Sequence, residues 1–153
     1  VTNGMKTRTV GSKTIDIEGA VGGNESFSSN VDAVVDWFGP VDMARMNNCE
    51  KVNDANSPEA ALIGGAPADN ADMVALISPI TYVKEEGPRF LVLHGDADNV
   101  VPHCQGVYFS EELKKANRLE EFISVPEGQH GPVTFNEDTF KKMTDFFKKE
   151  AAK

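Results

Sequence analysis

The segment RFLVLHGDADNVVP, residues 89–102, joins an apolar run to an acidic turn. A short apolar run that ends at a glycine is typical of a buried strand in a parallel sheet. We therefore predict a strand over residues 89–94, with Asp96 and Asp98 in the loop at its carboxyl end. Ligands of open α/β sheets bind at that edge. A loop carboxylate alone is more often a solvated surface group, so this segment does not yet assign a chemistry.

The segment GQHGP, residues 128–132, follows a second apolar stretch, residues 119–125. Glycines near His130 leave the backbone free to place its ring in a cleft, where a neutral imidazole could take a proton from a serine. Taken alone, a histidine that bonds to loop backbone groups is the simpler interpretation. The acidic loop and His130 together favour a catalytic interpretation, because an acid followed by a histidine at successive strand ends is the chain order of α/β-hydrolases.

The remaining pattern alternates strands and helices. Another apolar run, Val31–Phe38, stops at Gly39-Pro40 and predicts a strand, whereas residues 1–30 predict loop with one short strand. Helices are predicted over residues 57–64, 70–76, 104–116 and 136–150. Such alternation implies right-handed crossovers, and hence an α/β fold with a mostly parallel sheet of three strands flanked by helices.

Composition excludes several classes of function. The 153 residues carry 15 Lys plus Arg against 24 Asp plus Glu, a net charge of −9, which disfavours non-specific binding to nucleic acid or to anionic membranes. No apolar run approaches the roughly 20 residues of a membrane-spanning helix. Two cysteines cannot form a four-ligand zinc site by themselves, so no metal site is expected. Neither a nucleic-acid partner nor a membrane is therefore expected.

Several stretches together resemble α/β-hydrolase esterases of the acetyl-xylan and feruloyl esterase-like group. These stretches, in chain order, are VDAVVDWFGPVDM (31–43), SPEAALIGG (57–65), SPITYV (78–83), HGDADNVVPHCQ (94–105) and EELKKAN (111–117). The resemblance covers most of residues 31–150 and implies the carboxyl-terminal portion of an α/β-hydrolase fold.

The resemblance assigns roles to two residues. Asp98, the second Asp of the HGDxD pattern, is implied as the catalytic acid, and His130 is implied as the catalytic histidine. Asp96 is interpreted as structural, and His94 and His103 as structural or surface residues. No aromatic residue follows the His130-Gly131 pair, as one often does in the family, so the shape of the pocket is expected to differ. No cofactor is implied.

The family also requires a serine on a Gly-x-Ser-x-Gly elbow, and the sequence contains no such pentad. Residues 1–4 resemble the end of the helix that follows the elbow. Residues 1–153 are therefore expected to be the carboxyl-terminal part of a single α/β-hydrolase domain without its nucleophile. We expect this chain to be inactive alone, and to fold with the missing amino-terminal half or with a second copy.

The cysteines belong to two segments that the resemblance places at the active-site edge. Cys49 lies in the irregular segment after the first strand, and Cys104 begins the helix after the acidic loop. Two unrelated thiols remain the alternative, but we predict a disulfide, which would favour a periplasmic or secreted protein over a cytoplasmic one.

The function implied is a serine carboxylesterase that forms an acyl-enzyme and removes acetyl or feruloyl groups from plant polysaccharide. A serine peptidase of the prolyl-oligopeptidase type shares the acid and histidine loops and is one alternative. A catalytically inactive interaction module is another, although it would have no physical need for an acid and a histidine at adjacent strand ends. A Gly-x-Ser-x-Gly motif upstream would decide for an enzyme.

Overall fold

A three-stranded parallel sheet forms the centre of the molecule. The computed structural model describes residues 2, 4–52 and 54–153. The strands lie in the order β3-β4-β5, and their bounds are Ala33–Trp37 (β3), Arg89–Gly95 (β4) and Leu119–Val125 (β5). Both strand pairs are parallel. The predicted α/β fold with three central strands is confirmed.

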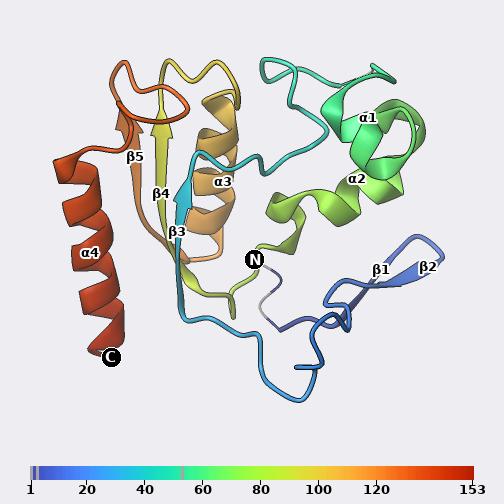
Figure 1. Cartoon of the computed structure of the whole chain (residues 1–153), viewed down its shortest axis with the longest axis horizontal. Helices are drawn as coiled ribbons and strands as arrows, with labels where there is room; N and C mark the ends of the chain where they lie inside the picture. The colour runs from blue at the N-terminus through green and yellow to red at the C-terminus, as the bar shows by residue number, and fades with distance from the viewer. Residues whose placement is uncertain (1, 3, 53) are drawn as a thin grey trace.

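Two helices cover the two faces of this sheet. Helix α3 (Cys104–Lys115) lies on one face and helix α4 (Glu137–Ala151) on the other (Figure 1). Successive side chains of β4 point to opposite faces, as the pleat of a strand requires. Phe90 and Val92 therefore pack with Phe109 and Leu113 of α3. Leu91 and Leu93 pack on the opposite face with Phe146 of α4.

A long excursion between β3 and β4 carries four short helical segments. They are α1 (Pro58–Ile63), η1 (Pro67–Asp69), α2 (Ala71–Ile77) and η2 (Pro79–Tyr82). The predicted start of α1 is confirmed, because the hydroxyl of Ser57 accepts a hydrogen bond from the amide of Ala60. The helix ends at Gly64, whose φ of 77° few other residues adopt.

The amino-terminal region differs from the prediction of one short strand. Strands β1 (Thr7–Val10) and β2 (Lys13–Asp16) form an antiparallel hairpin, separate from the central sheet. Each strand has only four residues, most of them exposed, so neither produces a clear apolar alternation. The guanidinium of Arg8 holds the hairpin to η2, because it donates to the Thr81 hydroxyl at 2.6 Å and lies 3.9 Å from the ring centroid of Tyr82. The helix end expected over residues 1–4 includes positions outside the described residues.

The carboxyl ends of the three strands meet at one edge, and the loops that follow them lie together there (Figure 1). Among the described strands, β3 is paired with β4 alone, so its other side is an edge of the sheet, as expected. Within the described part of the chain, no helix is long and apolar enough to cross a membrane.

Candidate active site

Asp98 lies in the loop that follows β4, with its side chain completely withdrawn from solvent. Its Oδ1 accepts hydrogen bonds from the amides of Val100, at 2.8 Å, and Val101, at 2.9 Å. Burial alone would raise the pKa of this carboxyl, but the two amides and the His130 imidazole outweigh it, and the pKa of Asp98 is lowered. The loop therefore holds a buried carboxylate in its ionised form at neutral pH.

His130 completes the pair that the sequence predicts. Its Nδ1 lies 2.9 Å from Oδ2 of Asp98, and its side chain is 31% exposed. Because a carboxylate can only accept, Nδ1 carries the proton in this bond and Nε2 of the neutral ring keeps a lone pair. No residue in the described part of the chain is recorded as bonding to Nε2. The buried Asp98 carboxylate thus orients the His130 ring so that Nε2 can act as a base.

His94 supports the acid loop from inside the fold. This residue of β4 is fully buried, and its Nε2 lies 3.0 Å from the carbonyl oxygen of Val101 and 3.6 Å from Oδ2 of Asp98. Burial lowers the pKa of His94, so the ring is neutral and Nε2 donates to Val101. The interpretation of His94 as a structural residue agrees with this placement. The Nε2 of His103 bonds the hydroxyl of Ser124 at 2.9 Å.

The two loops are packed directly against each other. A Cβ at Gly95 would lie 2.2 Å from the carbonyl oxygen of Gly128, so the backbones can approach only because both positions are glycine. Oδ1 of Asp96 accepts from the amide of Glu127 at 2.7 Å, which fits the structural role expected for Asp96. Thr134, fully buried, donates to the carbonyl of Gln129 at 2.6 Å. These contacts fix the backbone on either side of His130.

Phe38, which the sequence analysis did not single out, backs the His130 ring. Their ring centroids are 4.2 Å apart. Phe38 follows β3 and has a φ of 45°, unusual for a residue other than glycine, while its amide donates to the carbonyl of Leu93 at 2.8 Å. The signal in the sequence was an aromatic pair, Trp37-Phe38, directly before the Gly39-Pro40 strand stop.

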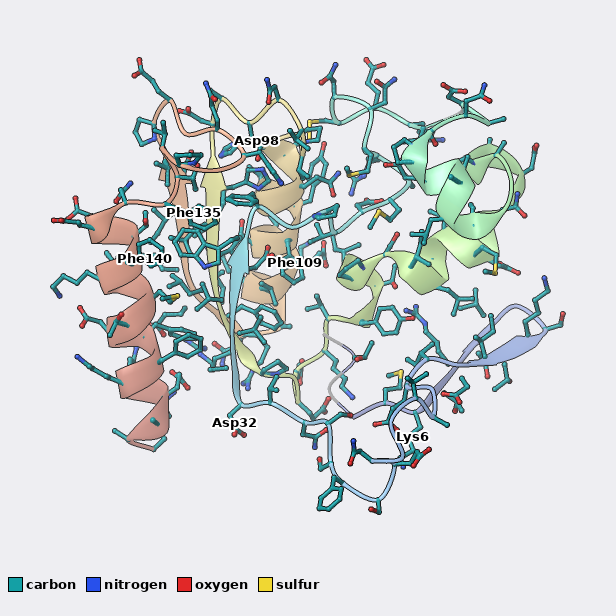
Figure 2. All side chains as sticks on the ribbon, in the orientation of Figure 1. Lys6, Asp32, Asp98, Phe109, Phe135 and Phe140 are labelled. Atoms are coloured by element: carbon teal, nitrogen blue, oxygen red, sulfur yellow. A yellow bond between two sulfur atoms is a disulfide. The ribbon has the colours of Figure 1, made fainter. Side chains whose placement is uncertain are left out.

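The excursion after β3 is attached to the start of α3, next to the acid loop. Cys49 and Cys104 form a disulfide, as predicted, with their Cα atoms 6.0 Å apart. The fully buried Gln105 accepts from the amides of Val41 and Asp42 and donates to the carbonyls of Asp42 and Arg45. Figure 2 shows the disulfide near the top of α3, at the same edge of the sheet as Asp98.

The site contains an acid and a base but no recorded nucleophile. None of the serines in the described ranges is recorded as bonding to His130. Among the residues that the structure describes, no cluster of His, Cys, Asp and Glu could hold a metal ion. The chemistry available here is therefore proton transfer at Nε2 of His130.

One known family is similar to most of the chain. The BD-FAE family model matches residues 4–113, which include the acid loop. The chain belongs to the BD-FAE family. Among curated proteins, esterase LipQ of Mycobacterium tuberculosis is 32% identical over 111 residues, which are 71% of this chain and 26% of LipQ. Esterase LipC of the same organism is 29% identical over 108 residues, 70% of this chain and 27% of LipC. This BD-FAE chain thus spans about a quarter of the curated relatives that it matches.

Solved structures extend the similarity across the whole chain. A bifunctional GH43-CE protein of Bacteroides eggerthii is 66% identical with a TM-score of 0.93, over 98% of this chain and 19% of that protein. A truncated carbohydrate esterase from gut microbiota is 55% identical with a TM-score of 0.94, over 99% of this chain and 54% of that protein. The Thermogutta terrifontis esterase Est2, at 21% identity and a TM-score of 0.61 over 85% of this chain and 46% of Est2, supports the fold class.

Proposed function

We propose that Asp98 and His130 are the acid and the base of a serine carboxylesterase, and that its nucleophilic serine lies on a segment outside residues 1–153. The observation that carries the proposal is the 2.9 Å bond between Nδ1 of His130 and the buried Asp98 carboxylate, on a side chain that is 31% exposed and whose Nε2 has no partner among the described residues. The esterases among the relatives, each longer than the matched region, support it.

The reaction follows from this geometry. Nε2 of His130 takes the serine hydroxyl proton while the serine Oγ bonds to the ester carbonyl carbon, and Asp98 stabilises the imidazolium that forms. The tetrahedral intermediate expels the alcohol, which takes the proton from His130. Water then hydrolyses the acyl-enzyme by the same proton transfers. The donors that bind the oxyanion lie with the nucleophile, on the proposed additional segment.

We assign the substrates to acetyl or feruloyl esters of plant oligosaccharides. Two carbohydrate-esterase structures, 66% and 55% identical to this chain, support this class. The disulfide between Cys49 and Cys104 supports an extracytoplasmic location, because such bonds persist in oxidising compartments. Activity in periplasmic or culture fractions, rather than in the cytoplasmic one, tests the location.

The activity is tested by p-nitrophenyl acetate turnover in two polypeptides. Residues 1–153 alone should be inactive, and the full polypeptide with a Gly-x-Ser-x-Gly segment should be active and inhibited by a serine-directed phosphonate. Sedimentation of the 153-residue polypeptide reports whether it associates with a second copy. Turnover by a stable 153-residue monomer, sensitive to the phosphonate, would contradict the proposal. Cleavage of peptide anilides instead of esters would favour the peptidase alternative.

A further inference from the structure

A polar groove adjoins the acid loop at the carboxyl edge of the sheet. It has a volume of about 620 Å³, and its walls come from the excursion, the start of α1 and the acid loop. Its charged and amide side chains are Asn47, Glu50, Lys51, Asp54, Asn56 and Glu59, and Val100 contributes from the acid loop. Since the amide of Val100 bonds Asp98, the groove begins two residues from the catalytic acid.

Glu59 is the residue of the groove that indicates a ligand-binding site. The residue is 9% exposed and lines the groove from the first turn of α1. No hydrogen bond or ion pair to its carboxylate is recorded within the described ranges. The neighbouring Asp54 differs, because its Oδ1 accepts from the amide and the side chain of Asn56. A carboxylate that lines a groove and has no protein donor can accept hydrogen bonds from a ligand that fills the groove.

The surrounding chemistry selects among possible donors. The described residues hold no cluster suited to a metal ion, here or elsewhere. A neutral sugar offers hydroxyl donors to the carboxylates and hydroxyl acceptors to the Asn47 amide. Its C–H face could lie on Val100, which is 62% exposed.

The groove walls are held in place before a ligand arrives. The disulfide from Cys49 to Cys104 and the four hydrogen bonds of Gln105 fix the excursion against α3. The N-cap bond of Ser57 fixes the first turn of α1, which carries Glu59. A preformed site loses less conformational entropy on binding, which suits a weakly binding oligosaccharide.

We propose that this groove binds the sugar of the ester's alcohol portion, and that the Glu59 carboxylate accepts hydrogen bonds from its hydroxyl groups. This inference rests on the proposed esterase function for its placement beside the reacting bond. It assigns to Glu59 a role in binding and none in proton transfer.

The kinetic test compares two acetate esters in the full polypeptide. Acetylated xylotriose has an alcohol portion that can fill the groove, whereas p-nitrophenyl acetate has none that fits a sugar site. In Glu59→Gln, the kcat/KM for acetylated xylotriose relative to that for p-nitrophenyl acetate should fall about tenfold, the worth of one charge-assisted hydrogen bond. The fall should be in KM. Glu85→Gln changes an exposed carboxylate before the amino end of β4, and it should leave the ratio unchanged.

A second variant and a binding measurement keep the groove testable apart from catalysis. Asn47→Trp fills the groove from an exposed wall position and should lower the same ratio. Calorimetric titration with xylotriose should show saturable binding that Glu59→Gln weakens about tenfold. An unchanged ratio in both variants, or no saturable binding by the wild type, would overturn the groove proposal. Absence of p-nitrophenyl acetate turnover in the wild type would instead overturn the proposed function, while the titration would still decide the groove.

Discussion

The loop after β4 and the strand β3 each hold an aspartate that is largely withdrawn from solvent. The pKa values of these two carboxyls are shifted in opposite directions. Asp98 receives two backbone amides and the His130 ring, and its pKa is lowered. Asp36, in the middle of β3, has one oxygen, Oδ2, buried without a hydrogen-bond partner. Burial, opposed only in part by the amide of Gly39, raises the pKa of Asp36 to about 6.

Burial raises the pKa of both carboxyls, but only at Asp98 do hydrogen-bond donors outweigh it. A loop can turn several amides toward one oxygen, as the loop of Asp98 does, whereas a strand commits its amides to its neighbours. The loop after β4 therefore keeps a negative charge beside His130. Strand β3 has the opposite property, and Phe38, the residue that follows it, packs against the His130 ring.

The largest effect expected from this comparison is on catalysis. Asp98→Asn should lower kcat/KM for p-nitrophenyl acetate by about 10⁴-fold, because an amide no longer fixes the tautomer of His130 or stabilises its charged form. Asp96→Asn is the matched control, since the Asp96 side chain bonds, among the described residues, the amide of Glu127 in the neighbouring loop, and it should stay within a few-fold of the wild type. Comparable losses in the two variants would contradict the assignment of Asp98 as the acid.

The next effect concerns the disulfide that joins the excursion to the start of α3, beside the acid loop. Replacing both cysteines, as Cys49→Ser with Cys104→Ser, should lower the free energy of unfolding by about 2–4 kcal/mol, because the bond closes a loop between residues 55 positions apart. Urea unfolding of the full polypeptide, with and without reductant, measures this. The double variant should no longer respond to reductant. A wild type whose stability is insensitive to reductant would show that the disulfide does not stabilise this region.

Strand β3 supplies the third test. Asp36 has a folded-state pKa of about 6 against an ordinary value of 3.8, so the unfolded chain releases this proton at lower pH than the fold does. Stability is then fully present below about pH 4 and falls as the pH rises through 6. Asp36→Asn should remove this slope and raise the free energy of unfolding at pH 7 by about 1–3 kcal/mol. A wild-type stability that does not fall between pH 4 and 7 relative to Asp36→Asn would contradict the buried, unsatisfied state of this carboxyl.

The sequence predicts those parts of the fold that depend on continuous apolar runs. Strands β3, β4 and β5 were recognisable because both faces of the sheet are covered, so Phe90–Leu93 reads as one uninterrupted apolar segment. The hairpin β1–β2 was not, because its residues are largely exposed, although β-branched residues around the turn at Gly11-Ser12 were a usable signal. The Asp98–His130 pair was predictable because parallel strands end at a common edge. Phe38 and Glu59 were not, because their positions depend on how an irregular excursion folds back on the sheet.

The smallest expected effect is the pH dependence of stability that comes from Asp98. Its sign is opposite to that expected for Asp36, because the two pKa values are shifted in opposite directions. The folded-state pKa of Asp98 is lowered, so its contribution to stability is present above the ordinary Asp pKa of 3.8 and is lost as the pH falls through the folded value. Asparagine at this position can still accept from the amides of Val100 and Val101, so the loop should keep its shape while the pH-dependent contribution disappears. The wild type should be more stable than Asp98→Asn at neutral pH, and this difference should shrink on acidification. The wild type should be less stable than Asp36→Asn at pH 7, and that difference should shrink from pH 7 to 4 and then stay constant. Urea midpoints of the three proteins from pH 7 to pH 3 measure both curves. If the two differences changed together over the same pH range, donors would not be what separates the two carboxyls, and the loop after β4 would have no special capacity to hold a charge beside His130.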